Sequence, residues 1–411
     1  MANVSSSNGL EKRPKLRFPS FDEPWEENEL SHYLVENTER NRGLAFGKGD
    51  VLSVSGEYGV INQIAFQGRS FAGESVADYH IVETDDIVYT KSPLKANPYG
   101  IIKVNKGIPG IVSTLYAVYH PLNTVAPRFV DLYFANDLRL NKFLKPLVNI
   151  GAKHDMKVNN SFVLTGTVVF PSISEQQKLV DFFAKLDRRI EAQRKIVDAL
   201  KKYKRGVMQR IFRNMSMLSP SGFETVQLSA IFKKISRRNN NEEIKNVITN
   251  SAEYGLIPQR DFFDKDIAVD GNTSNYYVIE HGDFVYNPRK SNTAPYGPFN
   301  RYEREERGII SPLYTCLVLQ ADIEPSYLAW YFKSDAWYRY IYDNGSQGVR
   351  HDRVSMTDGL LMGIPVIIPS KEAQLKIAKL LDCLESRFQT ELSQYESLKS
   401  IRVALLQQLF I

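Results

Sequence analysis

Two stretches of the chain place apolar side chains at a spacing that predicts long helices. Steps of alternately four and three residues pass through mainly apolar positions in 175–212 and again in 373–410. A repeat of about 3.5 residues is typical of helices that pack by knobs into holes. The predicted interface residues are Leu179, Phe183, Leu186, Ile190, Val197 and Leu200 in the first helix, and Ile377, Leu381, Leu384, Phe388, Tyr395 and Leu398 in the second.

Polar residues interrupt both series at equivalent places. Gln193 and Lys204 do so in the first helix, and Glu391 and Arg402 in the second. Because polar residues in such an interface set the register of the helices, we expect the two helices to pair with each other. The alternative is that each helix packs only on its own domain. At about 1.5 Å per residue, the paired stretch would form a rod of about 50 Å that acts as a spacer.

The remainder of each half alternates short apolar runs with turn residues, which is typical of strands. The segments HIVETDDIVYT and YVIEHGDFVYN are predicted as strand, turn and strand, with turns at 84–86 and 281–283. Segments 127–144 and 325–342 carry a helical period directly after a proline, a common helix start. Each half is therefore predicted to be an α+β domain followed by a long helix.

The two halves also share short motifs, which predicts an internal pseudo-twofold repeat. SVSGEYGVINQ (53–63) aligns with TNSAEYGLIPQ (249–259), and Gly151-Ala-Lys-His-Asp155 with Gly348-Val-Arg-His-Asp352. Segments 79–100 and 276–297, and 110–116 and 308–314, align as well. The predicted organisation is an N-terminal tail (1–19), a first domain (20–168), a first helix (169–213), a linker (214–222), a second domain (223–366) and a second helix (367–411).

Composition restricts the class of protein. The chain has 411 residues, 43% hydrophobic and 24% charged, enough for two or more folded cores. We find no signal peptide or membrane-spanning run and expect a cytoplasmic protein with no membrane partner. Two isolated cysteines exclude a disulfide framework or a zinc cluster. A net charge of +5 permits a polyanionic partner.

The sequence lacks the common catalytic motifs. It has no G-x-G-x-x-G after a strand, P-loop, H-E-x-x-H, Cys-x-x-Cys or nucleophile elbow. Asn97-Pro98-Tyr99 lacks the second proline of the loop with which amino-methyltransferases hold a flipped base, and Ala294 replaces the Asn in the other half. We therefore predict no catalytic residues and no metal site. A catalytic protein with an unseen motif and a coiled-coil adaptor that binds only protein remain alternatives.

The duplicated loops carry cationic, amide and aromatic side chains suited to DNA. Lys and Arg neutralise phosphates, while Arg, Asn, Gln and Ser read base edges. The alternatives are a solvated basic turn for the loops and a core position for the two tyrosines. The shared EYG is more consistent with framework, and divergent positions such as Asn62 are candidates for readout. The candidate DNA-binding residues are Tyr58, Gln63, Lys91, Ser92, Lys95, Lys153, His154 and Lys157 in the first half, and Tyr254, Gln259, Arg289, Lys290, Asn292, Arg350, His351 and Arg353 in the second.

Several motifs together resemble a known family. PKLRFPSFDEPWE (14–26), GDFVYNP (282–288), GIISPLY (308–314) and the junctions PSISEQQKLVDFF and PSKEAQLKIAKLL are similar to the specificity subunit of a type I restriction-modification enzyme. The resemblance covers the chain from about residue 14 to 411. One departure is Lys371-Glu372-Ala373-Gln374, where the first junction has Ser174-Glu175-Gln176-Gln177.

The resemblance implies a noncatalytic subunit that binds double-stranded DNA. Each domain would be a target-recognition domain that reads one half of an asymmetric two-part sequence, and the helices would form an antiparallel coiled coil. Two modification subunits would supply S-adenosylmethionine-dependent methylation of adenine N6. Restriction subunits would supply the ATP- and Mg-dependent motor and nuclease. This chain itself would bind no cofactor.

Overall fold

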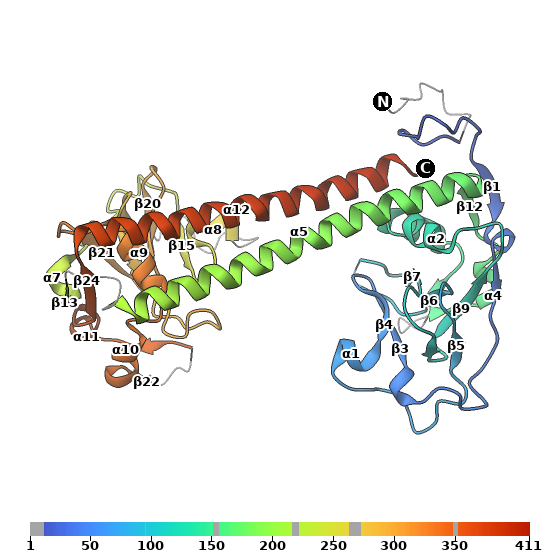
Figure 1. Cartoon of the computed structure of the whole chain (residues 1–411), viewed down its shortest axis with the longest axis horizontal. Coiled ribbons are helices and arrows are strands. Elements are labelled where there is room, and N and C mark those ends of the chain that lie inside the picture. Colours follow the sequence, from blue (N-terminus) through green and yellow to red (C-terminus); the bar gives the residue numbers. More distant parts are fainter. Residues whose placement is uncertain (1–11, 95, 151–155, 216–221, 263–272, 348–351) are drawn as a thin grey trace. The chain divides into compact units, whose positions relative to one another are not determined.

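The computed structural model describes residues 12–94, 96–150, 156–215, 222–262, 273–347 and 352–411 (Figure 1). The chain forms two compact units. The first contains the residues up to Gln193 together with Gln394–Ile411, and the second contains Arg194–Ser393. Each unit therefore includes a part of both long helices.

The first unit is a mixture of strands and short helices followed by the start of a long helix. Its strands are β1 (Glu26–Glu29), β2 (Leu34–Glu36), β3 (Leu52–Ser55), β4 (Gly59–Asn62), β5 (His80–Val82), β6 (Ile87–Thr90), β7 (Ile101–Val104), β8 (Gly110–Val112), β9 (Tyr116–Pro121), β10 (Asn149–Ile150), β11 (Met156–Lys157) and β12 (Thr167–Phe170). Its helices are η1 (Leu30–His32), η2 (Lys48–Asp50), α1 (Gln63–Gln67), α2 (Pro127–Tyr133), α3 (Asp137–Leu144), α4 (Asn160–Val163) and the first part of α5 (Ile173–Arg213).

The second unit has the corresponding elements. Its strands are β13 (Phe223–Gln227), β14 (Phe232–Lys234), β15 (Ile248–Ser251), β16 (Gly255–Pro258), β17 (Tyr277–Ile279), β18 (Phe284–Tyr286), β19 (Phe299–Arg301), β20 (Gly308–Ile310), β21 (Thr315–Leu319), β22 (Ser346–Gln347), β23 (Val354–Ser355) and β24 (Pro365–Pro369). Its helices are α7 (Leu228–Ile231), α8 (Gln259–Phe262), α9 (Pro325–Lys333), α10 (Tyr338–Asn344), α11 (Asp358–Met362) and the first part of α12 (Lys371–Gln408).

The same strand order occurs in both units. The antiparallel sheet β2-β9-β6-β7 of the first unit corresponds to β14-β21-β18-β19 of the second. Four two-stranded ladders also correspond: β1-β12 with β13-β24, β3-β4 with β15-β16, β5-β8 with β17-β20, and β10-β11 with β22-β23. The predicted strand, turn and strand segments are present, but β5 pairs with β8 and not with β6. The turn therefore links two sheets and does not close a hairpin.

The helices predicted after prolines begin there, but each is broken in two. Segment 127–144 divides into α2 and α3, and Asn136 caps α3 by accepting a hydrogen bond from the Arg139 N–H at 3.0 Å. A capping Asn competes with helix continuation, because its side chain satisfies amides that the preceding turn would otherwise bond. In the second unit, α9 ends at Lys333 and α10 begins at Tyr338.

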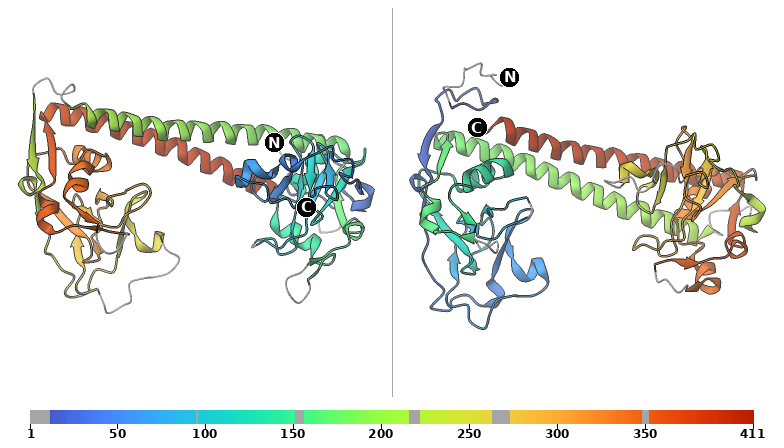
Figure 2. Two further views of the ribbon diagram at one scale, coloured as in Figure 1. Left: turned by 90° about the horizontal axis from the view of Figure 1, so that it is seen from below. Right: turned by 180° about the vertical axis from the view of Figure 1, so that it is seen from behind.

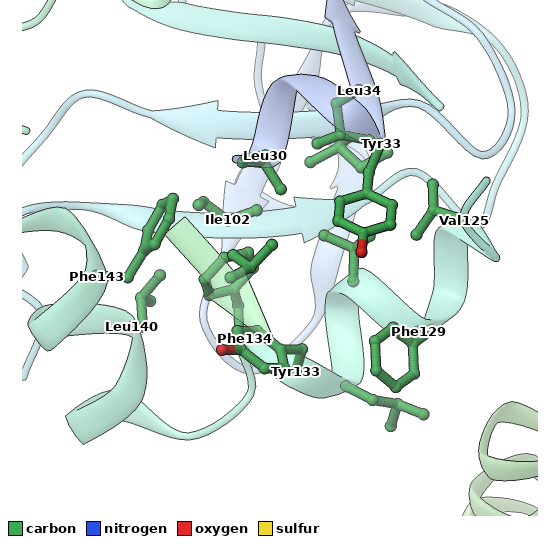
Figure 3. Packing of buried hydrophobic residues seen from close by; sticks show 14 of the residues in the cluster. Leu30, Tyr33, Leu34, Ile102, Val125, Phe129, Tyr133, Phe134, Leu140 and Phe143 are labelled. Atoms are coloured by element: carbon green, nitrogen blue, oxygen red, sulfur yellow. The ribbon is translucent and has the colours of Figure 1, made fainter. Parts of the chain in front are cut away.

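Both faces of each central sheet are buried. In the first unit, Ile87 and Tyr89 pack into the main core with α2, while Val88 points into a second cluster with Val82 and Val112. This follows from the alternation of side chains along a strand. The aromatic rings of Phe129 and Tyr133 from α2 fill the main core (Figure 3). Both rings pack close to Phe170. The central sheet of the first unit is therefore packed between two apolar clusters.

The long helices contact each other inside each unit. In the first unit, Leu179 and Phe183 of α5 share a core with Leu406 of α12. In the second, Ile211 of α5 shares a core with Ile377 and Leu381 of α12. The start of each helix therefore lies beside the end of the other, as the views in Figure 2 also show. Every predicted interface residue is buried or half-buried, whereas most positions between them are exposed.

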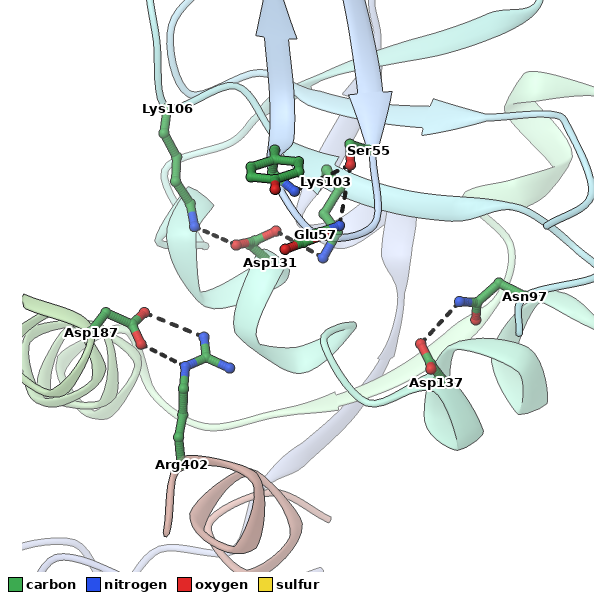
Figure 4. A network of polar contacts seen from close by, with 10 residues as sticks. Ser55, Glu57, Asn97, Lys103, Lys106, Asp131, Asp137, Asp187 and Arg402 are labelled. Atoms are coloured by element: carbon green, nitrogen blue, oxygen red, sulfur yellow. Dashed lines mark hydrogen bonds and ion pairs between the residues drawn. The ribbon is translucent and has the colours of Figure 1, made fainter. Parts of the chain in front are cut away.

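Two ion pairs join the helices at corresponding positions. In the first unit, Arg402 Nε lies 2.5 Å from Asp187 Oδ1 (Figure 4). In the second, Lys204 Nζ lies 2.5 Å from Glu385 Oε2. Lys204 and Arg402 are the cations that interrupt the apolar series in the sequence. Each therefore reaches a carboxylate of the opposite helix.

A buried glutamine fixes the start of each long helix to the domain before it. Gln176 accepts a hydrogen bond from the Ala126 N–H at 2.9 Å and donates to the Pro171 carbonyl at 2.9 Å. Gln374 does the same with the Glu324 N–H and the Pro369 carbonyl, both at 2.9 Å. Both glutamines are almost fully buried. The departure from the junction motif therefore leaves this joint intact, because Gln374 is retained.

Candidate nucleic-acid interface

The shared EYG sequence forms the turn of a β-hairpin in each unit. Ser55 Oγ accepts hydrogen bonds from the Glu57 and Tyr58 N–H groups at 3.3 and 3.2 Å (Figure 4). Ser251 makes the same two contacts, both at 3.2 Å. Gly59 and Gly255 follow at positive φ, +73° and +72°, a conformation that favours glycine. The serine and the glycine therefore account for the repeated motif.

The two tyrosines of the motif are surface residues. Tyr58 is 60% exposed and Tyr254 62% exposed. The alternative that they fill the domain core is therefore wrong, because each lies in the turn of a two-stranded ladder. Tyr58 lies 5.7 Å from the exposed Phe66 ring. An exposed aromatic pair of this kind offers a stacking surface.

The side-chain amides next to this hairpin in the first unit form hydrogen bonds within the protein. Gln63 donates to Ser53 Oγ at 3.2 Å and accepts from the Phe71 N–H at 2.7 Å. Asn62 caps α1 and donates to the Gly49 carbonyl at 2.6 Å. These side chains position the hairpin and α1, and their polar atoms are occupied. The corresponding Gln259 begins α8 and is half-buried.

In the first unit, Lys91 turns inward. Its Nζ donates to Asn160 Oδ1 at 3.2 Å, and Asn160 Nδ2 donates to Glu36 at 2.9 Å. Burial, together with the nearby Arg40, lowers the pKa of Lys91. Burial, Arg40 and Lys91 also lower the pKa of His80 to about 4, so that this ring is neutral at pH 7. Ser92 follows as a half-buried residue.

In the second unit, two candidate loops meet. The segment after β18 pairs with the segment before β23 through an antiparallel bridge between Arg289 and Arg353. Lys290 N–H donates to the Asp352 carbonyl at 2.9 Å. The Arg289 side chain is 69% exposed, Asn292 is exposed and Arg353 is half-buried. The structure therefore brings Arg289, Lys290 and Arg353 into one small region.

Five of the predicted residues lie outside the described residues. They are Lys95, Lys153, His154, Arg350 and His351. Lys157 belongs to β11, which pairs with β10, but its side chain is not described.

A buried amide network supports the second unit's loop, and the sequence analysis missed it. Asn250 donates to the Val285 carbonyl at 2.8 Å, and Asn300 donates to Asn250 Oδ1 at 2.7 Å. Asn287 donates to the Asn250 carbonyl at 3.2 Å and accepts from the Arg289 N–H at 2.9 Å. The available signal was the presence of Asn inside strands, where it is unfavourable. A buried amide in a strand usually has a partner of this kind.

The described residues hold no apparent metal centre or membrane span. Among them, no group of three or more His, Cys, Asp or Glu side chains is placed to hold a metal ion. In the same part of the chain, no helix has both the length and the apolar character that a membrane crossing requires.

Comparison with known proteins identifies the fold. The sequence matches no protein-family model and no curated protein sequence. The crystal structure of the S subunit of a type I restriction-modification system from M. genitalium, however, superposes with a TM-score of 0.53 at 14% identity. The match covers 97% of this chain and 99% of that chain. The chain has the fold of a type I specificity subunit.

A second solved structure, from a type I restriction-modification system, has a similar fold. That structure was solved to explain complex assembly and conformational transition of the system. It superposes on this chain with a TM-score of 0.50 at 14% identity, and the match covers 94% of this chain and 97% of that chain. In the specificity-subunit fold of this chain, the candidate loops follow corresponding strands, β6 and β18. The loops thus occupy equivalent places with different side chains.

Proposed function

We propose that this chain is the noncatalytic DNA-specificity subunit of a type I restriction-modification complex. Each unit would act as a target-recognition domain for one half of an asymmetric, two-part sequence. The observation that carries the proposal is the repetition of one strand order with different residues in the equivalent loops. Two related domains with different reading loops suit a target with two unlike halves.

The long helices would form an antiparallel coiled coil that sets the spacing of the two half-sites. The burial of the predicted interface residues and the ion pairs Arg402–Asp187 and Lys204–Glu385 support this pairing. A polar pair within an apolar interface favours one register over others. The pseudo-twofold repeat would then be the relation between the two domain-and-helix halves.

Partner subunits would perform the chemistry. Two modification subunits would bind S-adenosylmethionine and methylate adenine, and restriction subunits would use ATP and Mg for translocation and cleavage. Transfer of a methyl group to DNA by the purified chain alone would contradict the noncatalytic assignment. The same assay with an added modification subunit is expected to give methylation at one two-part motif.

A protein-only adaptor makes a different prediction about DNA. Phosphate contacts release counterions, so that binding of a specificity subunit to DNA weakens steeply as salt rises. An adaptor would show no salt-dependent association with a duplex. A titration of the assembled complex with labelled DNA at several salt concentrations separates the two functions.

Exchange of the first domain tests modular reading. Replacement of residues 20–168 by the first domain of another specificity subunit is expected to change one half of the methylated motif and to leave the other half as it was. A genome-wide map of adenine methylation in cells with and without the chimera measures this outcome. An unchanged motif would contradict the assignment of one domain to each half-site.

A further inference from the structure

The second unit carries a short two-stranded ribbon that presents two arginines opposite each other. The bridge between Arg289 and Arg353 is flanked by hydrogen bonds from Lys290 N–H to the Asp352 carbonyl and from Val354 N–H to the Pro288 carbonyl, both 2.9 Å. This pattern makes Arg289 and Arg353 a non-hydrogen-bonded pair, whose Cα atoms are typically about 4.5 Å apart. Directly opposed residues point to the same face of a ladder. Both arginine side chains therefore leave the ribbon on the same face.

This arrangement is electrostatically unfavourable for the protein alone. Like charges directly opposite each other destabilise an antiparallel pair. Arg289 Nε lies 4.0 Å from Asp352 Oδ2, and both side chains are more than half exposed, so this contact offsets little of the repulsion. A local conflict of this kind is typical of functional sites. A ligand that accepts hydrogen bonds from both arginines would remove it.

Hydrogen bonds to buried amides anchor the backbone of the ribbon. Asn287 accepts from the Arg289 N–H and is itself anchored to the Asn250 carbonyl. Gly297 ends the same loop at φ +85°, and a Cβ there would collide with the Asn287 carbonyl. The loop backbone is therefore fixed at both ends. Preorganisation lowers the entropic cost of binding through the two arginines.

The first unit has no equivalent pair. The residues that align with Arg289 and Arg353 are Ser92 and Met156. Lys91, the neighbouring cation, is tied to Asn160. Contacts to phosphate are independent of base sequence, and both domains would need them alike. Residues that differ at equivalent places are the ones suited to reading different bases.

We propose that Arg289 and Arg353 form a guanine-reading pair in the major groove, an inference that rests on the proposed DNA-specificity function. The major groove of B-DNA admits a two-stranded ribbon, and an arginine fork bonds the O6 and N7 atoms of guanine. Two arginines on one face of the ribbon reach two nearby guanines. The half-site of the second unit therefore contains guanine, and these two side chains select it.

Single replacements test each arginine in the complex with the modification subunits. The variants are Arg289→Ser and Arg353→Met, which introduce the residues of the first unit. The methylated motif is mapped across a genome for the wild type and for each variant. Each variant is expected to lose discrimination at one guanine by about 5- to 150-fold and to keep the other half-site unchanged. Arg339→Ala serves as the matched control, because this arginine is 83% exposed on α10 and pairs only locally with Asp343; its motif should equal that of the wild type.

Arg289→Lys separates base reading from phosphate binding. Lysine keeps the charge but loses the planar fork, so selectivity for guanine should fall while the salt dependence of binding is retained. Three results would overturn the inference: a relaxed position that is not guanine, affinity that falls equally for all sequences with a shallower salt slope, or full selectivity with lysine. Absence of any sequence-specific methylation in the wild type would instead refute the proposed function itself. Retained reading of the other half-site shows that the complex has assembled, and a thermal unfolding curve equal to that of the wild type shows that the second unit of the variant is folded.

Discussion

Removal of the Gln176 side chain is expected to destabilise the first unit strongly. Gln176→Ala would leave the Ala126 N–H and the Pro171 carbonyl without the partners that they now have at 2.9 Å. Ala126 and Pro171 are both buried. An unsatisfied buried polar group costs about 1–3 kcal/mol, so the two groups together predict a loss of about 2–6 kcal/mol. This loss in the free energy of unfolding is larger than that caused by most surface substitutions.

The neighbouring Gln177 provides the control. It is exposed and donates only to Asp181 one turn away, at 2.9 Å, an interaction worth about 0.2–0.5 kcal/mol. Thermal unfolding followed by circular dichroism or calorimetry compares the two variants. For a unit of this size, each kcal/mol corresponds to about 2–4 °C, so Gln176→Ala should lower the first unit's Tm by about 4–24 °C. Equal melting of the two variants would refute the role assigned to the buried amide.

Three further predictions concern other sites. Gly297→Ala should destabilise the second unit by at least about 1 kcal/mol in denaturant titration, because φ is +85° and the added Cβ would meet a backbone carbonyl. Gly206→Ala lies in open space on α5 and should instead stabilise the protein by about 1 kcal/mol, so equal shifts for the two variants would contradict this reasoning. Cys383 is exposed, while burial raises the pKa of Cys316 to about 12, so iodoacetamide should add one mass increment at pH 8 and a second only after denaturation; two increments in the native protein would be inconsistent with that burial. Phe410→Ala should cost about 3–5 kcal/mol in calorimetry and lower the first unit's transition, since Phe410 packs on Phe129 and Trp25; an unaltered transition would exclude this packing.

The sequence predicted the periodic elements well. The apolar series of the long helices depends on spacing alone. Helix α5 spans the whole first predicted stretch, and α12 spans the second as far as Gln408. The breaks between α2 and α3 and between α9 and α10 were not predicted, because capping by Asn136 competes with a helical period that continues beyond it. The pairing of β5 with β8 was equally hidden, since a short turn between strands does not reveal which strands form a ladder.

The candidate site was predicted only in outline. The basic and amide residues of the loops were apparent from composition, but whether a side chain faces outward depends on partners far along the chain. Lys91 is bound by Asn160, 69 residues away, and Gln63 by Ser53 and Phe71. The pairing of Arg289 with Arg353 likewise joins segments whose proximity no local pattern indicates. Long-range hydrogen bonds thus decided which candidates remain exposed.

Each unit borrows the end of a long helix from the other half of the sequence. Phe410 of the second half fills the first unit's core against Phe129, and Phe212 of the first half packs against Tyr327 in the second unit. These two contacts occupy equivalent positions, so the arrangement is that of an exchange between two identical copies. One half of the chain alone could complete such a core only by pairing with a second copy of itself, and under the proposed function that pair would read a palindrome. Because both copies are joined in one chain here, each domain can differ from the other, which is what the proposed asymmetric target would require.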